Sequence, residues 1–196
     1  MPTPKKYILT RKPKEYLKQG AVHCGVYTAK AVLEAYGKGV HNDPKKYHVS
    51  TLNRMTGAMP RTTDLVNVFT EYGLTTQVMS IKGKSDNQKL EILKNILRKN
   101  TPVPVAVGNG YSYSIGAITH SALKNLLVGH FVSIWGYDDT EGVFYIYDST
   151  VPKEYYSKNI PIGNIKRPYK DFLRDWNGSI YCKFFGPYPY YQIEEN

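Results

Sequence analysis

Two apolar runs separated by a short polar loop restrict the fold of this chain more than any other feature. Residues 130–135 (HFVSIW) and 143–148 (VFYIYD) are rich in aromatic and β-branched side chains, and the loop between them holds two glycines and two aspartates. Such runs favour strands, and a short loop of this composition joins antiparallel neighbours. The second half of the chain therefore predicts an antiparallel sheet.

Helical patterning marks the first half of the chain instead. Apolar residues recur at three- and four-residue steps after Cys24 and again over residues 64–72 and 90–97. The sequence Ser-Asp-Asn-Gln at 85–88 is a capping box and indicates a helix start. Helices followed by strands in one short chain predict an α+β fold. Shorter predicted segments are helices at 51–55, 121–127 and 169–176 and strands at 74–80, 102–107 and 180–185.

The length and composition fit one domain that spans residues 1–196. A chain of 196 residues with 41% apolar side chains can form its own core and is too short for two full-sized domains. We expect residues 1–18 to form a basic N-terminal arm, because prolines interrupt this segment and lysine dominates its charge. There is no apolar run of about 18 residues, so we expect no membrane span. The chain starts without a secretory signal pattern, which makes the cytoplasm the default location and leaves delivery by another route open.

The net charge of +10 at pH 7 is compatible with an anionic partner such as nucleic acid, a lipid surface or an acidic peptide. The sequence nevertheless has no arginine-rich tract, zinc-finger pattern or glycine-rich phosphate loop. We therefore favour a solvated basic surface and do not expect a nucleic-acid partner. The oligomeric state has no signal in the sequence.

The two cysteines differ in their predicted surroundings. Cys24 lies where an irregular segment meets the first helix, and the positive end of a helix dipole favours a thiolate. Cys182 falls inside a predicted strand, where we expect a structural role. Two cysteines cannot form a disulfide scaffold or a four-ligand zinc site by themselves. A lone cysteine is most often a small buried side chain, so Cys24 needs partners before it indicates catalysis.

A nucleophilic thiol needs a base, and the histidines compete for this role. His130 begins the first apolar strand, where a structural histidine and a catalytic base fit equally well. His23 adjoins Cys24 in sequence, but neighbouring side chains generally point apart. His41 and His48 lie in a lysine-rich loop, and we expect both at the surface.

The register of the two strands decides whether a carboxylate can orient His130. In a hairpin centred on Asp139, the facing residues are Val132 with Ile146, Ile134 with Phe144, and His130 with Asp148. The first two pairs are apolar, so burial supports this register. Facing Cβ atoms lie about 5 Å apart, and a carboxylate at that distance can hold an imidazole N–H while the other ring nitrogen faces a thiol. A simple ion pair at the sheet edge is the competing interpretation.

Gln19 lies five residues before Cys24. A side-chain amide beside a nucleophile can donate a hydrogen bond to the oxyanion that develops during acyl transfer. Gln19 is therefore the fourth candidate site residue.

These segments together resemble the papain-like cysteine peptidases. The resemblance rests on Gln19 and Cys24-Gly25 at a helix start, Gly129-His130-Phe131-Val132 at a strand start, and Tyr147-Asp148 at a strand end. The compact form is similar to the bacteriocin-processing, leader-peptide peptidase group, over most of residues 16–186. The resemblance implies a helical half that carries Cys24, packed on a twisted antiparallel sheet that carries His130 and Asp148.

The resemblance also implies a role for each candidate residue. Cys24 would be the nucleophile, His130 the general base and acid, Asp148 the residue that orients His130, and Gln19 the oxyanion donor. The implied reaction is hydrolysis of a peptide or amide bond through a thioester, on a peptide or protein substrate and without a metal or organic cofactor.

Two other classes of function stay open. The same residues would serve an acyltransferase, a transglutaminase or a deamidase, which differ in the nucleophile that resolves the thioester. A non-catalytic binding module would instead use the positive charge and exposed tyrosines to contact nucleic acid or an acidic partner. The tyrosines in question are Tyr188, Tyr190 and Tyr191.

Overall fold

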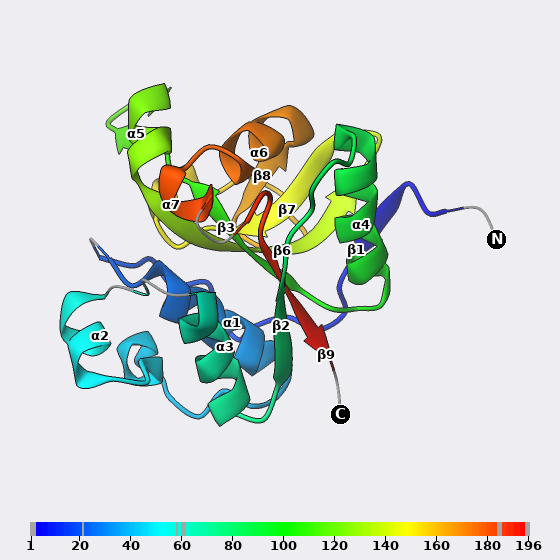
Figure 1. The fold of residues 1–196 in the computed structure, drawn as a ribbon. Coiled ribbons are helices and arrows are strands. Elements are labelled where there is room, and N and C mark those ends of the chain that lie inside the picture. The colour runs from blue at the N-terminus through cyan, green and yellow to red at the C-terminus, as the bar shows by residue number, and fades with distance from the viewer. Residues whose placement is uncertain (1–2, 21, 58, 60–61, 184–185, 195–196) are drawn as a thin grey trace.

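A seven-stranded antiparallel sheet forms the centre of the structure (Figure 1). The computed structural model describes residues 3–20, 22–57, 59, 62–183 and 186–194, and within them the strand order is β2-β9-β3-β6-β7-β8, with β1 paired to β6. The strands of this sheet are β1 (Lys6–Ile8), β2 (Thr75–Met79), β3 (Val103–Gly108), β6 (Gly129–Asp138), β7 (Val143–Tyr147), β8 (Ile165–Pro168) and β9 (Tyr190–Glu194). A separate hairpin consists of β4 (Tyr111–Ser114) and β5 (Ala117–His120).

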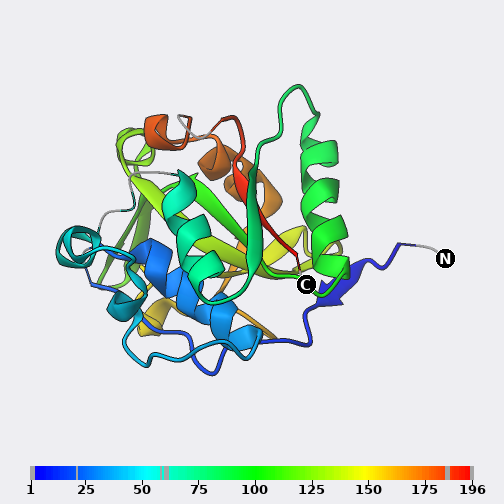
Figure 2. The ribbon, with the colours of Figure 1, turned by 60° about the horizontal axis from the view of Figure 1, so that its bottom comes forward.

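Helices lie on both sides of the sheet, with α1 and α3 against one face and α6 on the other (Figures 1 and 2). The α-helices are α1 (Cys24–Ala35), α2 (Thr51–Thr56), α3 (Thr62–Glu71), α4 (Asp86–Arg98), α5 (Ala122–Leu127), α6 (Tyr169–Trp176) and α7 (Ile180–Lys183). Two short 3-10 helices are η1 (Pro44–Tyr47) and η2 (Lys153–Tyr155). The predicted α+β class, with helices packed on a twisted antiparallel sheet, is confirmed.

β6 is the strand around which the core is built. β3 and β1 pair with one of its edges and β7 with the other, so residues 130–138 are all buried. α1 packs against β6 and α3 through Val26, Val32 and Leu33, which are fully buried and each contribute about 1.5–3 kcal/mol of transfer free energy. The Thr28 hydroxyl also donates a hydrogen bond to the Phe131 carbonyl at 3.2 Å. This bond joins α1 to the start of β6.

Most predicted elements occur near their expected bounds, but the strand predicted at 180–185 is wrong. Residues 180–183 form α7, and 184–185 lie outside the described residues. The Ser179 hydroxyl accepts a hydrogen bond from the Tyr181 N–H at 3.1 Å at the start of this helical turn. A short apolar run does not distinguish a helix from a strand, which explains the error. The last strand is β9, which the sequence analysis did not predict.

The predicted arm also contains regular structure. Lys6–Ile8 form β1 and pair with the end of β6, so part of this segment belongs to the sheet.

The helix α4 begins with the predicted capping box: the Gln88 backbone N–H donates to the Ser85 hydroxyl, and the Ser85 N–H donates to the Gln88 side chain.

The predicted register of the β6–β7 hairpin is wrong by two residues near the candidate site. Ile134 pairs with Ile146 rather than with Phe144. An even shift keeps each side chain on its predicted face, because side chains alternate along a strand. His130 and Asp148 therefore share a face as diagonal neighbours rather than as a directly facing pair.

The shift has two causes in the hairpin itself. β6 continues to Asp138, which pairs with Val143, so the turn is shorter than predicted. The Asp138 carboxylate supports this turn by accepting hydrogen bonds from the backbone N–H groups of Thr140 and Glu141, at 2.9 and 3.2 Å. At the turn the pairing is displaced by three residues from the predicted register, and a bulge at Trp135 takes back one of them, which leaves the displacement of two residues near the site.

Gly163 is expected to be a sensitive position, because its φ is +79° and a Cβ there would lie 2.5 Å from the Ile146 carbonyl oxygen in β7. Gly83 is a matched control, with a φ of +70° and no atom within 4 Å of its Cβ position. Both changes to alanine strain the backbone, but Gly163→Ala also forces β7 to move. We expect Gly163→Ala to lower the free energy of unfolding by about 1–3 kcal/mol more than Gly83→Ala, as measured by urea denaturation. Equal losses would contradict the close packing described here.

Candidate active site

The thiol of Cys24 lies at the start of α1. The preceding residue, His23, has a φ of 88° and ends the irregular segment, so Cys24 is the first residue of a 12-residue helix. The aligned peptide dipoles place a partial positive charge at this end of the helix, which favours a thiolate. Cys24 as a whole residue is partly exposed, and it lines a cleft.

His130 lies near the start of β6, and its imidazole lines the same cleft as the Cys24 thiol. Burial raises the pKa of Cys24, but the nearby imidazole of His130 outweighs it and holds this pKa below its ordinary value. Burial lowers the pKa of His130, but Asp148 and Cys24 together raise it above its ordinary value. The two shifts favour a thiolate beside an imidazolium.

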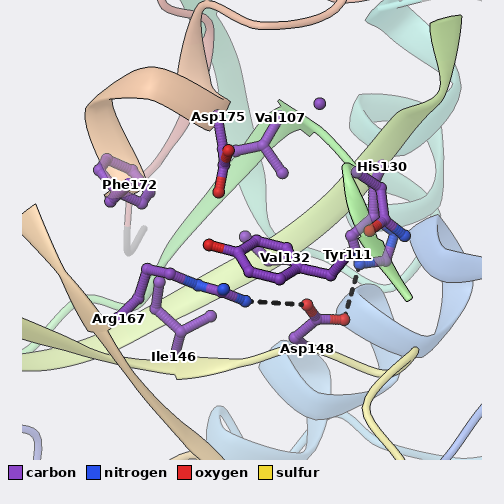
Figure 3. A pocket seen from close by; sticks show the side chains of 11 residues that line it. Val107, Tyr111, His130, Val132, Ile146, Asp148, Arg167, Phe172 and Asp175 are labelled. Atoms are coloured by element: carbon purple, nitrogen blue, oxygen red, sulfur yellow. Dashed lines mark hydrogen bonds and ion pairs between the residues drawn. The ribbon is translucent and has the colours of Figure 1, made fainter. Parts of the chain in front are cut away.

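Asp148 directly follows β7, and its carboxylate contacts the other side of the imidazole (Figure 3). One oxygen, Oδ1, lies 2.8 Å from His130 Nε2 and accepts hydrogen bonds from the Thr150 N–H at 2.9 Å and hydroxyl at 2.6 Å. The other, Oδ2, lies 3.6 Å from Nη2 of Arg167. Burial raises the pKa of Asp148, but His130, Arg167 and Thr150 hold it well below its usual range. Asp148 therefore stays ionised although it is only 4% exposed.

Asn164, which the sequence analysis did not single out, fixes the backbone of Asp148. The Asp148 N–H donates to the Asn164 side-chain oxygen at 2.9 Å, and the Asn164 side-chain N–H donates to the Asp148 carbonyl at 2.8 Å. Asn164 is buried, so these bonds are shielded from water. The amide replaces a neighbouring strand at the point where β7 ends. A contact between residues 16 positions apart has no local sequence signal.

Gln19 is buried and lines the same cleft as Cys24 and His130. Its backbone N–H donates to the Ser149 carbonyl at 2.8 Å, and the Ser149 hydroxyl donates to Gln19 Oε1 at 2.5 Å. With Oε1 held by Ser149, the amide N–H groups are the part of Gln19 left to donate. The structure thus brings the four residues singled out in the sequence to one place, while their chemical roles stay predictions.

A cleft of about 340 Å³ lies in front of the thiol. Its size is in the range of small-ligand sites. Among its described lining residues, none is an aspartate, glutamate, lysine or arginine. Val22 and Met59 line it from the part of the structure around α1. Leu127, Val128 and Tyr181 line it from the part around the start of β6.

The prediction that His48 lies at the surface is wrong. His48 is only 4% exposed, and its Nε2 lies 2.9 Å from His23 Nδ1. The loop folds as η1 against α1, with Lys45 and Lys46 outward and the next two residues inward. His41, also predicted at the surface, is partly buried.

Cys182 lies apart from this arrangement, in α7, and is 1% exposed. Burial raises the pKa of Cys182 to about 12. His120 also has its own partner, Asp175, at 3.2 Å.

Among the described residues, no group of three or more histidine, cysteine or acidic side chains is placed to hold a metal ion. No described helix is long and apolar enough to cross a membrane.

Comparisons with known proteins identify a family. The model of the peptidase C39-like family matches residues 11–179, a span that contains Gln19, Cys24, His130 and Asp148. No curated protein gives a significant match.

Similar folds occur among solved structures. A double-glycine-motif protease from an AMS/PCAT transporter, solved in complex with the leader peptide, is 16% identical with a TM-score of 0.53, over 96% of this chain and 98% of that one. A protein of Bacillus anthracis described as a C39-like peptidase is 15% identical with a TM-score of 0.57, over 97% and 98% of the two chains. Xylellain, a cysteine protease from Xylella fastidiosa, is 14% identical with a TM-score of 0.51, over 100% of this chain and 87% of that one. At such identities the likeness concerns the fold.

The buried His48 predicts a loss of stability in mild acid. Burial lowers the pKa of His48 to about 4, and the charges of His23 and Arg54 act in the same direction. In the unfolded chain a histidine titrates near pH ~6.5, so between these values the unfolded state binds more protons. The stability present above about pH 6.5 should therefore decrease as the pH falls toward 4. His48→Leu should flatten this part of a pH series of urea unfolding curves, and an unchanged slope would contradict the assignment.

Proposed function

The chain belongs to the peptidase C39-like family, and we propose that it hydrolyses a peptide or amide bond of a peptide or protein substrate with Cys24 as the nucleophile. The observation that carries the proposal is the convergence of three residues beside the cleft: Cys24 and His130 both line it, and His130 is hydrogen-bonded to Asp148. A nucleophile, an imidazole and a carboxylate in this order of contact recur in acyl-transfer enzymes of unrelated folds.

In the first step the Cys24 thiolate attacks the carbonyl carbon of the scissile bond, and the π electrons of that carbonyl move to its oxygen. Hydrogen bonds from the Gln19 amide and the Cys24 backbone N–H stabilise this oxyanion. The protonated His130 then transfers a proton to the departing nitrogen. The carbon–nitrogen bond breaks, the amine leaves, and a thioester remains on Cys24.

Water resolves the thioester in the second step. Neutral His130 takes a proton from the water as its oxygen attacks the thioester carbonyl carbon. The tetrahedral intermediate collapses to a carboxylic acid and the Cys24 thiolate, and the imidazolium is ready for the next cycle. Asp148 accepts the Nε2–H of His130 throughout, which keeps the ring in one orientation.

The lining of the cleft supports a peptide segment as the ligand. Apolar side chains from both parts of the structure face it, and its described lining residues include no aspartate, glutamate, lysine or arginine. A similar solved structure, the double-glycine-motif protease, holds a leader peptide. We propose a peptide as the ligand class for this chain as well.

Product analysis by mass spectrometry tests the reaction itself. The protein is incubated with a mixed peptide library, with and without an added primary amine, beside the variants Cys24→Ala and Cys182→Ala. Cleaved peptides with free carboxylates, formed by the wild type and Cys182→Ala only, support the proposal. Amide products would indicate an acyltransferase, and side-chain deamidation without cleavage would indicate a deamidase. Peptide binding without turnover that survives in Cys24→Ala would indicate a binding module.

The two thiols should differ strongly in reactivity. Cys24 should react with iodoacetamide at pH values well below the ordinary thiol pKa of about 8.5, because His130 stabilises its thiolate. Cys182 should react far more slowly, because it is buried and its pKa is raised to about 12. Intact-protein mass spectrometry over a pH series, with Cys182→Ala and Cys24→Ala as controls, measures both rates. Equal labelling with an ordinary thiol pH profile would contradict a catalytic Cys24.

The oxyanion role of Gln19 predicts a change in kcat. Gln19→Ala should lower kcat by about 100-fold or more and leave KM and Cys24 alkylation nearly unchanged, because the amide contacts only the developing charge. Ser149→Ala serves as a comparison, since Ser149 reaches the oxyanion only through Gln19. It should lower kcat by less, and it should have no further effect in the Gln19→Ala background. A change in KM alone would assign the amide to substrate binding instead.

A further inference from the structure

Arg167 contacts the carboxylate of Asp148 from the side opposite to His130 (Figure 3). It lies on β8, where it pairs with Phe144 of β7. Paired residues share a face of the sheet, and Asp148 follows Phe144 by an even number of positions. The side chain of Arg167 therefore lies on the same face as Asp148, and only 13% of it is exposed.

The two carboxylate oxygens of Asp148 have different partners. His130 and Thr150 occupy Oδ1, whereas Nη2 of Arg167 lies 3.6 Å from Oδ2. The guanidinium is held in place by the ring of Tyr111, whose centroid lies 3.9 Å from its central carbon. The ring therefore limits the movement of the guanidinium beside the carboxylate.

The other charged and titratable groups around Arg167 leave Asp148 as its main acidic partner. The groups that face it are Tyr111 and Tyr113 of β4, Asp175 of α6, and Asp148 after β7. Asp175 already has two partners of its own, Arg174 Nε at 3.0 Å and His120 Nε2 at 3.2 Å. Asp148 has His130 as its only other nearby basic group among the described residues.

The proposed reaction makes a permanent counter-charge necessary. His130 alternates between imidazolium and neutral imidazole in each turnover, and in its neutral state it no longer balances the charge of Asp148. A buried carboxylate without a counter-charge is unfavourable and tends to take up a proton. A guanidinium stays charged at every pH at which proteins are folded, so Arg167 can balance Asp148 in both states of His130.

We infer that Arg167 is a positioning residue that keeps Asp148 ionised and oriented through the steps in which His130 is neutral. The inference rests on the proposed function, because it assigns Arg167 a role in the same site. It also predicts that Arg167 acts through Asp148 and not on the substrate.

The first test is the pH dependence of Cys24 alkylation by iodoacetamide in a Cys182→Ala background, which needs no substrate. Loss of a positive charge raises the pKa values of the acids near it. Arg167→Met should therefore move the midpoint of thiolate formation upward by about 0.5–1 pH unit, as expected when a charge beyond direct contact is removed in a medium of intermediate dielectric constant. Arg167→Lys keeps the charge and should keep the wild-type midpoint. If Arg167→Met melts at a lower temperature but keeps the wild-type pH midpoint of Cys24 thiolate formation, the role of Arg167 is purely structural and the inference is overturned.

His130→Ala separates failure of this inference from failure of the proposed function. Removal of the imidazole should return the Cys24 midpoint toward its ordinary value. If His130→Ala leaves the midpoint unchanged, the Cys24–His130 pair itself is not formed in solution and the proposed function fails. If His130→Ala moves the midpoint and Arg167→Met does not, only the role of Arg167 is overturned.

The second test compares Arg167→Met alone with the double variant Arg167→Met/Asp148→Asn. It can still be carried out if Arg167→Met alone folds poorly. Arg167→Met should lower kcat/KM by about 10- to 100-fold in the wild type, as a displaced catalytic group does, and have no further effect in Asp148→Asn. Arg167→Met/Asp148→Asn removes both charges together, so it should fold even where Arg167→Met alone does not. A further loss of kcat/KM in the double variant, or its failure to fold, would show that Arg167 acts through other contacts and overturn the inference.

Discussion

The arrangement of the site depends on one buried charge, the carboxylate of Asp148. A carboxylate that is only 4% exposed stays ionised only where neighbouring groups replace the water it has lost. Here the replacements come from separate segments: His130 on β6, Arg167 on β8 and Thr150 after β7. Asn164 holds the backbone of Asp148 in place. Their convergence requires that β6, β7 and β8 pair in one fixed register. The sheet is therefore the support of the site as well as its core.

The thiol and the imidazole come from different parts of the structure, so the packing of α1 on β6 sets their separation. The Thr28 hydroxyl and the buried stripe of α1 hold these two elements together beside the cleft. Stability and reactivity are coupled for this reason, since a shift of α1 changes the distance between Cys24 and His130. The same packing leaves a cleft at the boundary, which both groups line.

The solved structures with this fold share only 14–16% of their residues with the chain. What they have in common is therefore an arrangement of elements, and many different side chains can build it. In this chain the arrangement is a helix that begins at a cysteine, a buried strand that begins near a histidine, and a neighbouring strand that ends before an aspartate. Asn164, Ser149 and Arg167 support that arrangement through their contacts with Asp148 and Gln19.

The sequence by itself determined the α+β class, the helix that starts at Cys24 and the shared face of His130 and Asp148, because these depend on short periodic patterns. The prediction that His130 and Asp148 share a face stayed correct although the register was wrong. The error was two residues, and side chains along a strand return to the same face every two residues. Tertiary structure decided the bulge at Trp135, the helix in place of a strand at 180–183, and the burial of His48. It also decided the contacts of Asn164 and Arg167 with Asp148. These features depend on partners distant in the chain, and the pattern of nearby residues carries no information about which distant groups the fold brings together.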